Sequence, residues 1–200
     1  MSDYIFLFDL DSTITTKEIL PTISQKIGML EEMRKLTEAT MCGELPFRTS
    51  FLKRVDILRD IKVSEIREIV ANIPLNYHIA NFISDHSERC YIVTGNLDVW
   101  ISDLMLELNM RSHVYCSRAQ VKDDRIKQVI SVIDKELMVK QFVQPLVVVG
   151  DGDNDSGMAK YADIAIGFGG VRNIASSLLR NIDYAFYDDK KCVDFLVSLL

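Results

Sequence analysis

The chain has 200 residues and a mass of 22.8 kDa, a length typical of one domain or of one domain with a modest insertion. Apolar residues make up 48% and charged residues 26%, and these proportions exclude a disordered chain. The formal charge of −6 excludes a general nucleic-acid binder, which would carry a basic face.

Neither a membrane span nor an export signal is apparent. Apolar runs are far shorter than the roughly 18 residues that a bilayer requires, and acidic residues stand where a signal peptide would be basic and then apolar. The four cysteines are widely separated. We therefore expect a cytoplasmic protein with reduced, mostly buried thiols and no membrane partner.

Four short apolar runs are predicted to be strands, at residues 4–8, 90–93, 146–149 and 163–166. Continuous runs of β-branched and aromatic residues suit strands that are buried on both faces, as in a parallel sheet covered by helices. Polar or glycine-rich residues follow each run. Because open α/β sheets bind ligands at the carboxyl ends of their strands, these polar clusters mark the predicted functional edge.

Helical segments make up the rest of the chain. Four of them lie between the first and second strands, at residues 17–27, 30–41, 47–60 and 64–72. No strand interrupts these four, so we interpret residues 15–75 as a helical cap domain inserted after the first strand. Residues 1–14 and 76–200 then form the core, with further helices predicted at 99–108, 135–143, 157–161, 174–180 and 193–200. The predicted fold class is α/β, a Rossmann-like parallel sheet core flanked by helices, with a small helical-bundle cap.

Two acidic clusters follow the first and third strands. Asp9 and Asp11 stand two residues apart, and the second cluster contains Asp151, Asp153 and Asp155. Carboxylates gathered at one edge repel each other unless a cation or a proton lies between them. Oxygen ligands without clustered His or Cys favour Mg²⁺ over zinc. Turn formation alone would explain these residue types but not so much like charge, so the sequence predicts a magnesium site.

Other residues could contact a phosphoryl group beside that site. Thr94 and Gly95 supply a hydroxyl and a backbone N–H after the second strand. Lys135 could neutralise phosphoryl oxygens from the start of a helix. Taken alone, Thr94 and Gly95 are explained by a turn and Lys135 by a solvated surface, and the spacing leaves Lys127 and Lys140 open.

The segments Phe8-Asp9-Leu10-Asp11-Ser12-Thr13, Thr94-Gly95, Lys135 and Gly150-Asp151-Gly152-Asp153-Asn154-Asp155 stand in the order of the four motifs of the haloacid dehalogenase (HAD) superfamily. Within that superfamily the chain resembles the phosphoserine phosphatase family nearly end to end. The resemblance implies that Asp9 is a nucleophile forming an aspartyl phosphate and that Asp11 is the general acid and base. It implies Mg²⁺ held by Asp9, Asp11 (through its carbonyl) and Asp151, with Asp155 supporting the water shell. It also implies that Thr94, Gly95 and Lys135 contact the substrate phosphate and that Asn154 binds the substrate.

The resemblance extends into the predicted cap. Glu18 falls where the family contacts the substrate ammonium group, and Arg54 falls where it pairs with the substrate carboxylate. Met41 and Phe47 fall where it packs against the small substrate side chain. The simpler interpretation is that Glu18 and Arg54 pair with solvent or with each other.

The expected function is therefore a Mg²⁺-dependent phosphomonoesterase that hydrolyses O-phosphoserine, in serine biosynthesis, as a monomer or homodimer. The alternative is a HAD phosphatase acting on another small phosphorylated metabolite, and a phosphoaspartate signalling domain is a third possibility. Three residues depart from the family pattern: Thr94 replaces serine, Asn96 replaces glycine and Asp153 replaces a small residue. These departures bear on amino-acid specificity more than on phosphatase chemistry. The expected cap hinges are residues 15–17 and 74–77.

Overall fold

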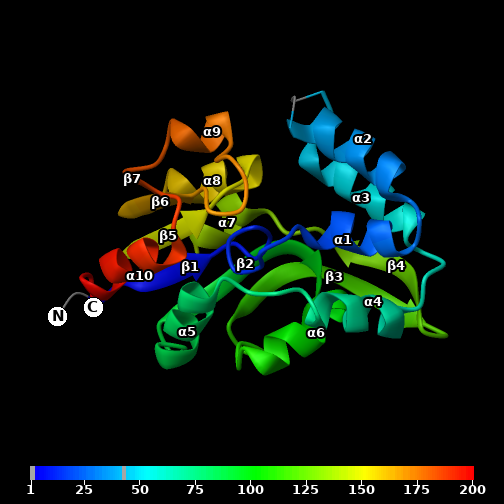
Figure 1. Cartoon of the computed structure of the whole chain (residues 1–200), viewed down its shortest axis with the longest axis horizontal. Coiled ribbons are helices and arrows are strands. Elements are labelled where there is room, and N and C mark those ends of the chain that lie inside the picture. The colour runs from blue at the N-terminus through cyan, green and yellow to red at the C-terminus, as the bar shows by residue number, and fades with distance from the viewer. Residues whose placement is uncertain (1–2, 42–43) are drawn as a thin grey trace.

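The computed structural model describes residues 3–41 and 44–200, apart from the side chain of Met41. In this part of the chain the strands form one sheet in the order β4-β3-β2-β1-β5-β6-β7 (Figure 1). All neighbouring pairs in it are parallel except β3 and β4. The strands are β1 (Ile5–Phe8), β2 (Cys90–Leu97), β3 (Val114–Lys122), β4 (Arg125–Ser131), β5 (Leu146–Gly150), β6 (Ile164–Phe168) and β7 (Tyr184–Phe186). The predicted α/β fold is confirmed.

Helices cover both faces of the sheet, because side chains of the central strands alternate between them. Phe6 and Phe8 of β1 belong to a core cluster with residues of α5, α6 and α10, whereas Leu7 packs with residues of α7 and α8. Figure 1 shows these two sets of helices on opposite sides of the sheet. Their bounds are α5 (Tyr77–Asp85), α6 (Asp98–Glu107), α7 (Lys135–Val139), α8 (Ser156–Ala159), α9 (Ser176–Leu179) and α10 (Asp189–Val197).

The segment between β1 and β2 is helical, as expected. It contains α1 (Ile19–Lys26), α2 (Leu30–Met41), α3 (Phe47–Ile57) and α4 (Val63–Ala71), followed by α5. In Figure 1, α2 and α3 stand apart from the helices of the sheet, above α1. α4 instead packs against α6, where Arg67 forms an ion pair with Asp103. A hydrogen bond joins the connection that leads into α1–α4 to the connection that leads out of them. In it, Thr16 N donates to the Pro74 carbonyl at 2.8 Å.

Several elements differ from the sequence prediction. β3, β4, β7 and α5 were not expected. The second half of β3 and most of β4 are exposed, so neither strand is one continuous apolar run. β2 extends to Leu97, so that Thr94 and Gly95 lie within the strand rather than in a turn after it. The helices expected at 47–60 and 135–143 end earlier, at Ile57 and Val139.

Two expectations about the surface and the thiols can be compared with this fold. No helix among the described residues has the length and apolar character needed to cross a membrane. Cys90, Cys116 and Cys192 are free, with Cys90 and Cys192 buried. Cys42 lies outside the described residues.

Candidate active site

The turn after β1 fixes the first two aspartates. Asp9 continues the β1–β5 ladder, because its N–H donates to the Val149 carbonyl at 2.9 Å. At Ser12 the backbone enters the left-handed region, with a φ of 58°, which is uncommon for a residue other than glycine. Asp11 Oδ1 then accepts a hydrogen bond of 2.7 Å from Ile19 N, at the start of α1. The unpaired N–H groups at a helix start attract a carboxylate, so they hold Asp11 at the strand end.

The loop after β5 is organised by Asp155, which is fully buried. Its Oδ2 atom accepts hydrogen bonds from the main-chain N–H groups of Asp151 at 3.1 Å and Gly152 at 2.9 Å. A Cβ atom at Gly150 would lie 2.6 Å from Asp155 Cγ, so glycine is required there. The loop therefore wraps around one carboxylate and presents Asp151 beside Asp9.

Lys135 reaches the same cluster from α7. Asp134 caps this helix by accepting a hydrogen bond of 3.0 Å from Leu137 N, which directs Lys135 inward from the first turn. The Lys135 ammonium donates to Asp9 and, at 2.7 Å, to Asp155 Oδ1. Lys127 and Lys140, the other lysines that spacing left open, are both exposed. The structure thus places Lys135, and neither alternative, against the two carboxylates.

The acidic cluster fits a divalent cation. Asp9, Asp151 and Asp155 each offer an oxygen atom, and these atoms all lie within 4.8 Å of one another. Asp151 Oδ1 is buried and has no hydrogen-bond partner among the described residues. An unpartnered buried oxygen within a group of carboxylates is the donor set that Mg²⁺ prefers.

Electrostatics in this cluster favour a cation as well. Burial raises the pKa of Asp9 well above its usual range, and Asp155 raises it further, while Lys135 opposes the shift. Burial likewise raises the pKa of Asp151 to about 7, against the lowering effect of Arg172. Each carboxylate is therefore hard to ionise without additional positive charge, which a divalent cation would supply.

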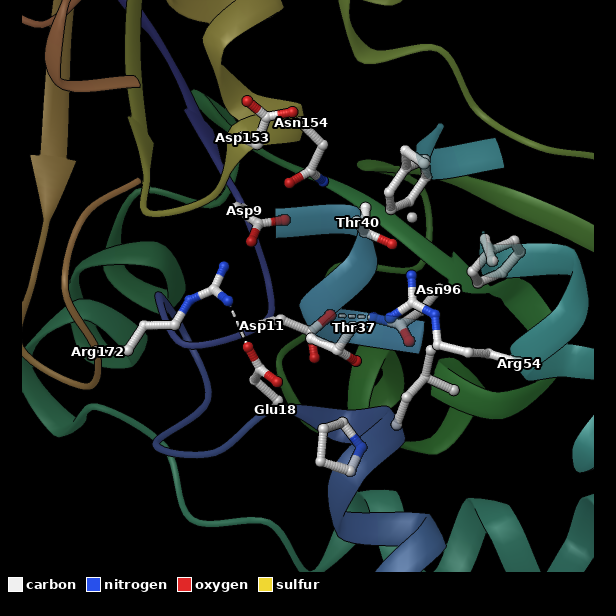
Figure 2. Close-up of a pocket in the computed structure, with 15 residues that line it drawn as sticks. Asp9, Asp11, Glu18, Thr37, Thr40, Arg54, Asn96, Asp153, Asn154 and Arg172 are labelled. Atoms are coloured by element: carbon white, nitrogen blue, oxygen red, sulfur yellow. Dashed lines mark hydrogen bonds and ion pairs between the residues drawn. The ribbon is translucent and has the colours of Figure 1, made fainter. Parts of the chain in front are cut away.

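A cavity of about 110 Å³ opens beside these aspartates (Figure 2). This volume is far below the roughly 300–1,000 Å³ of pockets for drug-sized ligands, so it suits a small metabolite. Asp9, Asp11 and Asn154 line it from the sheet side, and Glu18 and Arg54 line it from the helices between β1 and β2. Leu20, Pro21, Thr37, Thr40, Phe47, Phe51, Gly95, Asn96, Asp153 and Arg172 complete the lining.

Arg172 is a charged residue of the site that sequence reasoning missed. It lies in the loop after β6, and Figure 2 shows it pointing to Glu18. Its Nη1 atom lies 2.5 Å from Glu18 Oε1, and its Nε atom donates to Asp151. The only sequence signal was an arginine shortly after Gly169 and Gly170, at the end of an apolar strand.

Glu18 and Arg54 do not form an ion pair with each other in the described structure. Arg54 is buried, and its Nε atom has no hydrogen-bond partner among the described residues. Burial lowers the pKa of Arg54, while Asp11 and Glu18 oppose that shift. A buried guanidinium aimed at a cavity without a protein partner is free to bind an anionic ligand group.

The remaining predicted contacts lie close to the cavity or outside the described residues. The side chain of Met41 is outside them. Phe47 stacks on Phe51 with ring centroids 5.9 Å apart, and a Cβ atom at Gly95 would lie 2.6 Å from the tip of its ring. Thr94 is buried and is not among the residues that line the cavity, and its Oγ1 atom accepts a hydrogen bond of 2.9 Å from Asn96 Nδ2.

Comparison with known proteins identifies similar chains. The family model for haloacid dehalogenase-like hydrolases matches residues 6–160. Phosphoserine phosphatase of Methanocaldococcus jannaschii is 27% identical over 179 residues, which cover 82% of this chain and 84% of that protein. The phosphoserine phosphatase of Lactococcus lactis is 24% identical over 194 residues, 90% of this chain and 89% of the other. A third, from Archaeoglobus fulgidus, is 27% identical, and the matched region spans only 52% of its length.

Solved structures share the fold. A phosphoserine phosphatase with an analogue of its phospho-aspartyl intermediate superposes with a TM-score of 0.81 and 24% identity, covering 98% of this chain and 99% of that one. A substrate-bound phosphoserine phosphatase superposes with a TM-score of 0.82 and 23% identity, over the same shares of the two chains.

Proposed function

The chain belongs to the haloacid dehalogenase-like hydrolases, and on that basis we propose that it is a Mg²⁺-dependent phosphomonoesterase that hydrolyses O-phosphoserine to serine and phosphate. The observation that carries the proposal is the convergence of Asp9, Asp151 and Asp155 with Lys135 beside a small cavity. The relatives named phosphoserine phosphatase support the choice of substrate.

The proposed reaction has two steps. In the first, an Asp9 carboxylate oxygen attacks phosphorus while Asp11 gives a proton to the departing serine oxygen, leaving a phosphorylated Asp9. In the second, Asp11 takes a proton from water as that water attacks the phosphorus. The P–O bond to Asp9 breaks, phosphate leaves and the Asp9 carboxylate is restored.

We propose that the residues around Asp9 supply positive charge for this transfer. Mg²⁺ would be held by the Asp9 carboxylate, the Asp11 carbonyl and Asp151, with Asp155 supporting its water shell, and when bound it would neutralise charge on the phosphoryl oxygens. Lys135 would add a second cation. Thr94, the Gly95 N–H and Asn154 would donate hydrogen bonds to the same oxygens.

Recognition of the amino acid is proposed for the opposite end of the cavity. Arg54 would pair with the substrate carboxylate, which its unpartnered Nε atom supports. Glu18 would contact the ammonium group through the carboxylate oxygen that does not face Arg172. Phe47 and Met41 would pack against the methylene group.

We also propose that residues 15–75 form a cap over a core of residues 1–14 and 76–200, and that the enzyme works in the cytoplasm as a monomer or homodimer. The cap proposal is supported by Glu18, Phe47 and Arg54, which line the same cavity as Asp9. Burial of a small substrate between two such parts would exclude water from the transfer.

The test is phosphate release from a panel of phosphorylated amino acids, hydroxy acids and sugars, with and without Mg²⁺. Hydrolysis of O-phosphoserine that requires Mg²⁺ and is lost in Asp9→Asn is expected. Equal rates with Asp9→Asn, or no release from any phosphomonoester, would overturn the proposal. A long-lived phosphoprotein without turnover would indicate a signalling domain instead.

A second substrate class is favoured by one observation. Arg172 pairs with Glu18, so the Glu18 carboxylate is already neutralised, and Arg54 is the lining arginine with an unpartnered buried nitrogen among the described residues. Such a site would also accept a small phosphorylated acid without an ammonium group, and the hydroxy-acid phosphates of the panel test this alternative.

A further inference from the structure

Asn96 stands where the related family commonly has glycine, and the mechanism above gives it no role. It is 3% exposed and lies at the irregular end of β2, where the pairing register with β3 shifts. Its side chain nevertheless borders the cavity. A buried amide at this place must satisfy its hydrogen bonds with the residues around the reacting groups.

The Asn96 side chain contacts two residues with proposed roles in the reaction. Its Nδ2 atom donates to Asp11 Oδ2, the contact drawn in Figure 2, and to Thr94 Oγ1 at 2.9 Å. The other oxygen of Asp11 accepts from Ile19 N at 2.7 Å. Both carboxylate oxygens of Asp11 are therefore held by donors that cannot easily move, one at a helix start and one a buried amide.

The orientation of this amide is determined by its neighbours. A reversed amide would turn the Asn96 oxygen toward the Asp11 carboxylate, and two acceptors facing each other repel. Thr94 Oγ1 accepts a second hydrogen bond, from Asn96 N at 3.2 Å. Both acceptor positions of the Thr94 hydroxyl are then used, so this hydroxyl can form a further hydrogen bond only as a donor. A donor of this kind is suited to bind an anion.

We propose that Asn96 is a positioning residue that holds the carboxyl group of Asp11 in place for proton transfer to the leaving oxygen. The inference rests on the proposed phosphatase function. In the first step the proton passes from the Asp11 carboxyl to the departing oxygen as its bond to phosphorus breaks and the bond from Asp9 forms. Asn96 neither gives nor takes a proton, and it acts only by fixing Asp11.

The leaving group provides a measurement that a merely structural role would not change. An alkoxide such as that of serine must be protonated as it leaves, whereas p-nitrophenolate is a much weaker base and leaves without a proton. The ratio of kcat/KM for O-phosphoserine to kcat/KM for p-nitrophenyl phosphate therefore reports the proton transfer. Damage to phosphate binding lowers both values and cancels in the ratio.

The experiment compares the purified wild-type chain with Asn96→Gly and Asn96→Asp, in the presence of Mg²⁺. The first change removes the amide, and the second keeps its shape but replaces the donor with an acceptor. Asn72→Gly is the matched control, because Asn72 is exposed and, among the residues that the structure describes, its Nδ2 atom donates only to the Glu68 carbonyl, at 2.7 Å. Thermal unfolding of each variant identifies any variant that does not fold. If one Asn96 variant does not fold, the other one provides the test, because the ratio compares two substrates on the same protein.

We expect kcat/KM for O-phosphoserine to fall roughly 10- to 100-fold in the Asn96 variants, the loss typical of a hydrogen bond to a charged group. The value for p-nitrophenyl phosphate should fall by a much smaller factor, and Asn72→Gly should leave both unchanged. Equal losses on the two substrates, or no loss on either, would overturn the inference while leaving the phosphatase proposal intact. If the wild-type chain hydrolyses neither substrate nor any other phosphomonoester, the phosphatase proposal itself fails.

Discussion

Arg172 forms ion pairs with both Glu18 and Asp151, although 154 residues separate it from Glu18. It therefore connects the proposed substrate-binding end of the cavity with the proposed metal site. Glu18 is half-buried, and burial raises its pKa while Arg172 lowers it. The negative charge that a substrate ammonium group would meet is already partly neutralised by the protein.

Removal of Arg172 should increase selectivity for substrates with an ammonium group. In Arg172→Gln, Glu18 loses its ion pair and the ammonium group meets one cation fewer. We expect the ratio of kcat/KM for O-phosphoserine to that for a hydroxy-acid phosphate to rise about tenfold, comparable to one charged hydrogen bond. Glu18→Gln should lower the same ratio. If both variants left it unchanged, Glu18 would not contact the ammonium group.

Lys135 should be required for stability as well as for turnover. Burial lowers its pKa, but Asp155 and Asp9 raise it more, so the net shift is upward and the ammonium group stays charged. Lys135→Met leaves two buried carboxylates without their cation, which should destabilise the metal-free protein by about 3–5 kcal/mol in urea unfolding. Asp9→Asn in the same chain should restore part of that loss. Additive effects of the two changes would show that the pair is not coupled.

The stabilisation by Mg²⁺ should depend on pH through Asp151. Its pKa in the folded chain, about 7, lies above the ordinary value of 3.8, so between these values the folded state binds more protons than the unfolded state. The stabilisation of the folded state by protonated Asp151 is complete below the unfolded-state pKa. It is lost as pH rises through the folded-state pKa. Mg²⁺ must displace the proton, so its binding is weaker in the acidic part of that window.

Thermal unfolding with and without saturating Mg²⁺ measures this linkage. We expect the rise in Tm caused by Mg²⁺ to be larger at about pH 8 than at about pH 5, because Asp151 is ionised only at the higher pH. Asp151→Asn should remove most of the rise at both values. A rise in Tm that is independent of pH would contradict a role for Asp151 as a metal ligand.

Limited proteolysis should detect closure of the proposed cap. Sequence reasoning placed the hinges at residues 15–17 and 74–77, and the structure joins these connections through the Thr16–Pro74 hydrogen bond. We expect cleavage there to slow when Mg²⁺ and a phosphate mimic are bound together, since a closed cap protects both connections. Cleavage at the exposed residues 143–145, in the loop between α7 and β5, serves as the internal control. Equal slowing at both places, or none, would count against a moving cap.

The sheet and the acidic cluster could be predicted because their signals are local. β1 and β5 are buried on both faces, so each is one apolar run, and each ends directly at Asp9 or Asp151. Lys135 could be named only as one of three lysines, since its approach to Asp9 depends on how α7 packs against the loop after β5.

The parts that could not be predicted depend on contacts between distant segments. Arg172 carries no local pattern, and its role emerges only where β6 brings its loop beside Glu18 and Asp151. The same is true of β3 and β4, in which exposed residues interrupt any continuous apolar run. Asn96 was noticed as a departure from a family pattern, but its hydrogen bond to Asp11 required the fold.

Contact between Gly95 and Phe47 should control the size of the cavity. A Cβ atom at position 95 would lie 2.6 Å from the tip of the Phe47 ring, much closer than side-chain atoms approach. In Gly95→Ala the ring must therefore move, and it can, because it is the far end of a side chain on α3. The ring lines the cavity and stacks on Phe51, so its displacement changes the space available to a substrate.

We expect Gly95→Ala to raise KM for O-phosphoserine about tenfold, which corresponds to the roughly 1–3 kcal/mol typical of overpacking. Its Tm should stay close to that of the wild type, because the ring can shift without moving the backbone. Phe47→Leu shortens the side chain, so the double variant should recover a KM near that of Phe47→Leu alone. A double variant whose KM equals the product of the two single effects would mean that Gly95 acts on the substrate directly, through its N–H, rather than through the Phe47 ring.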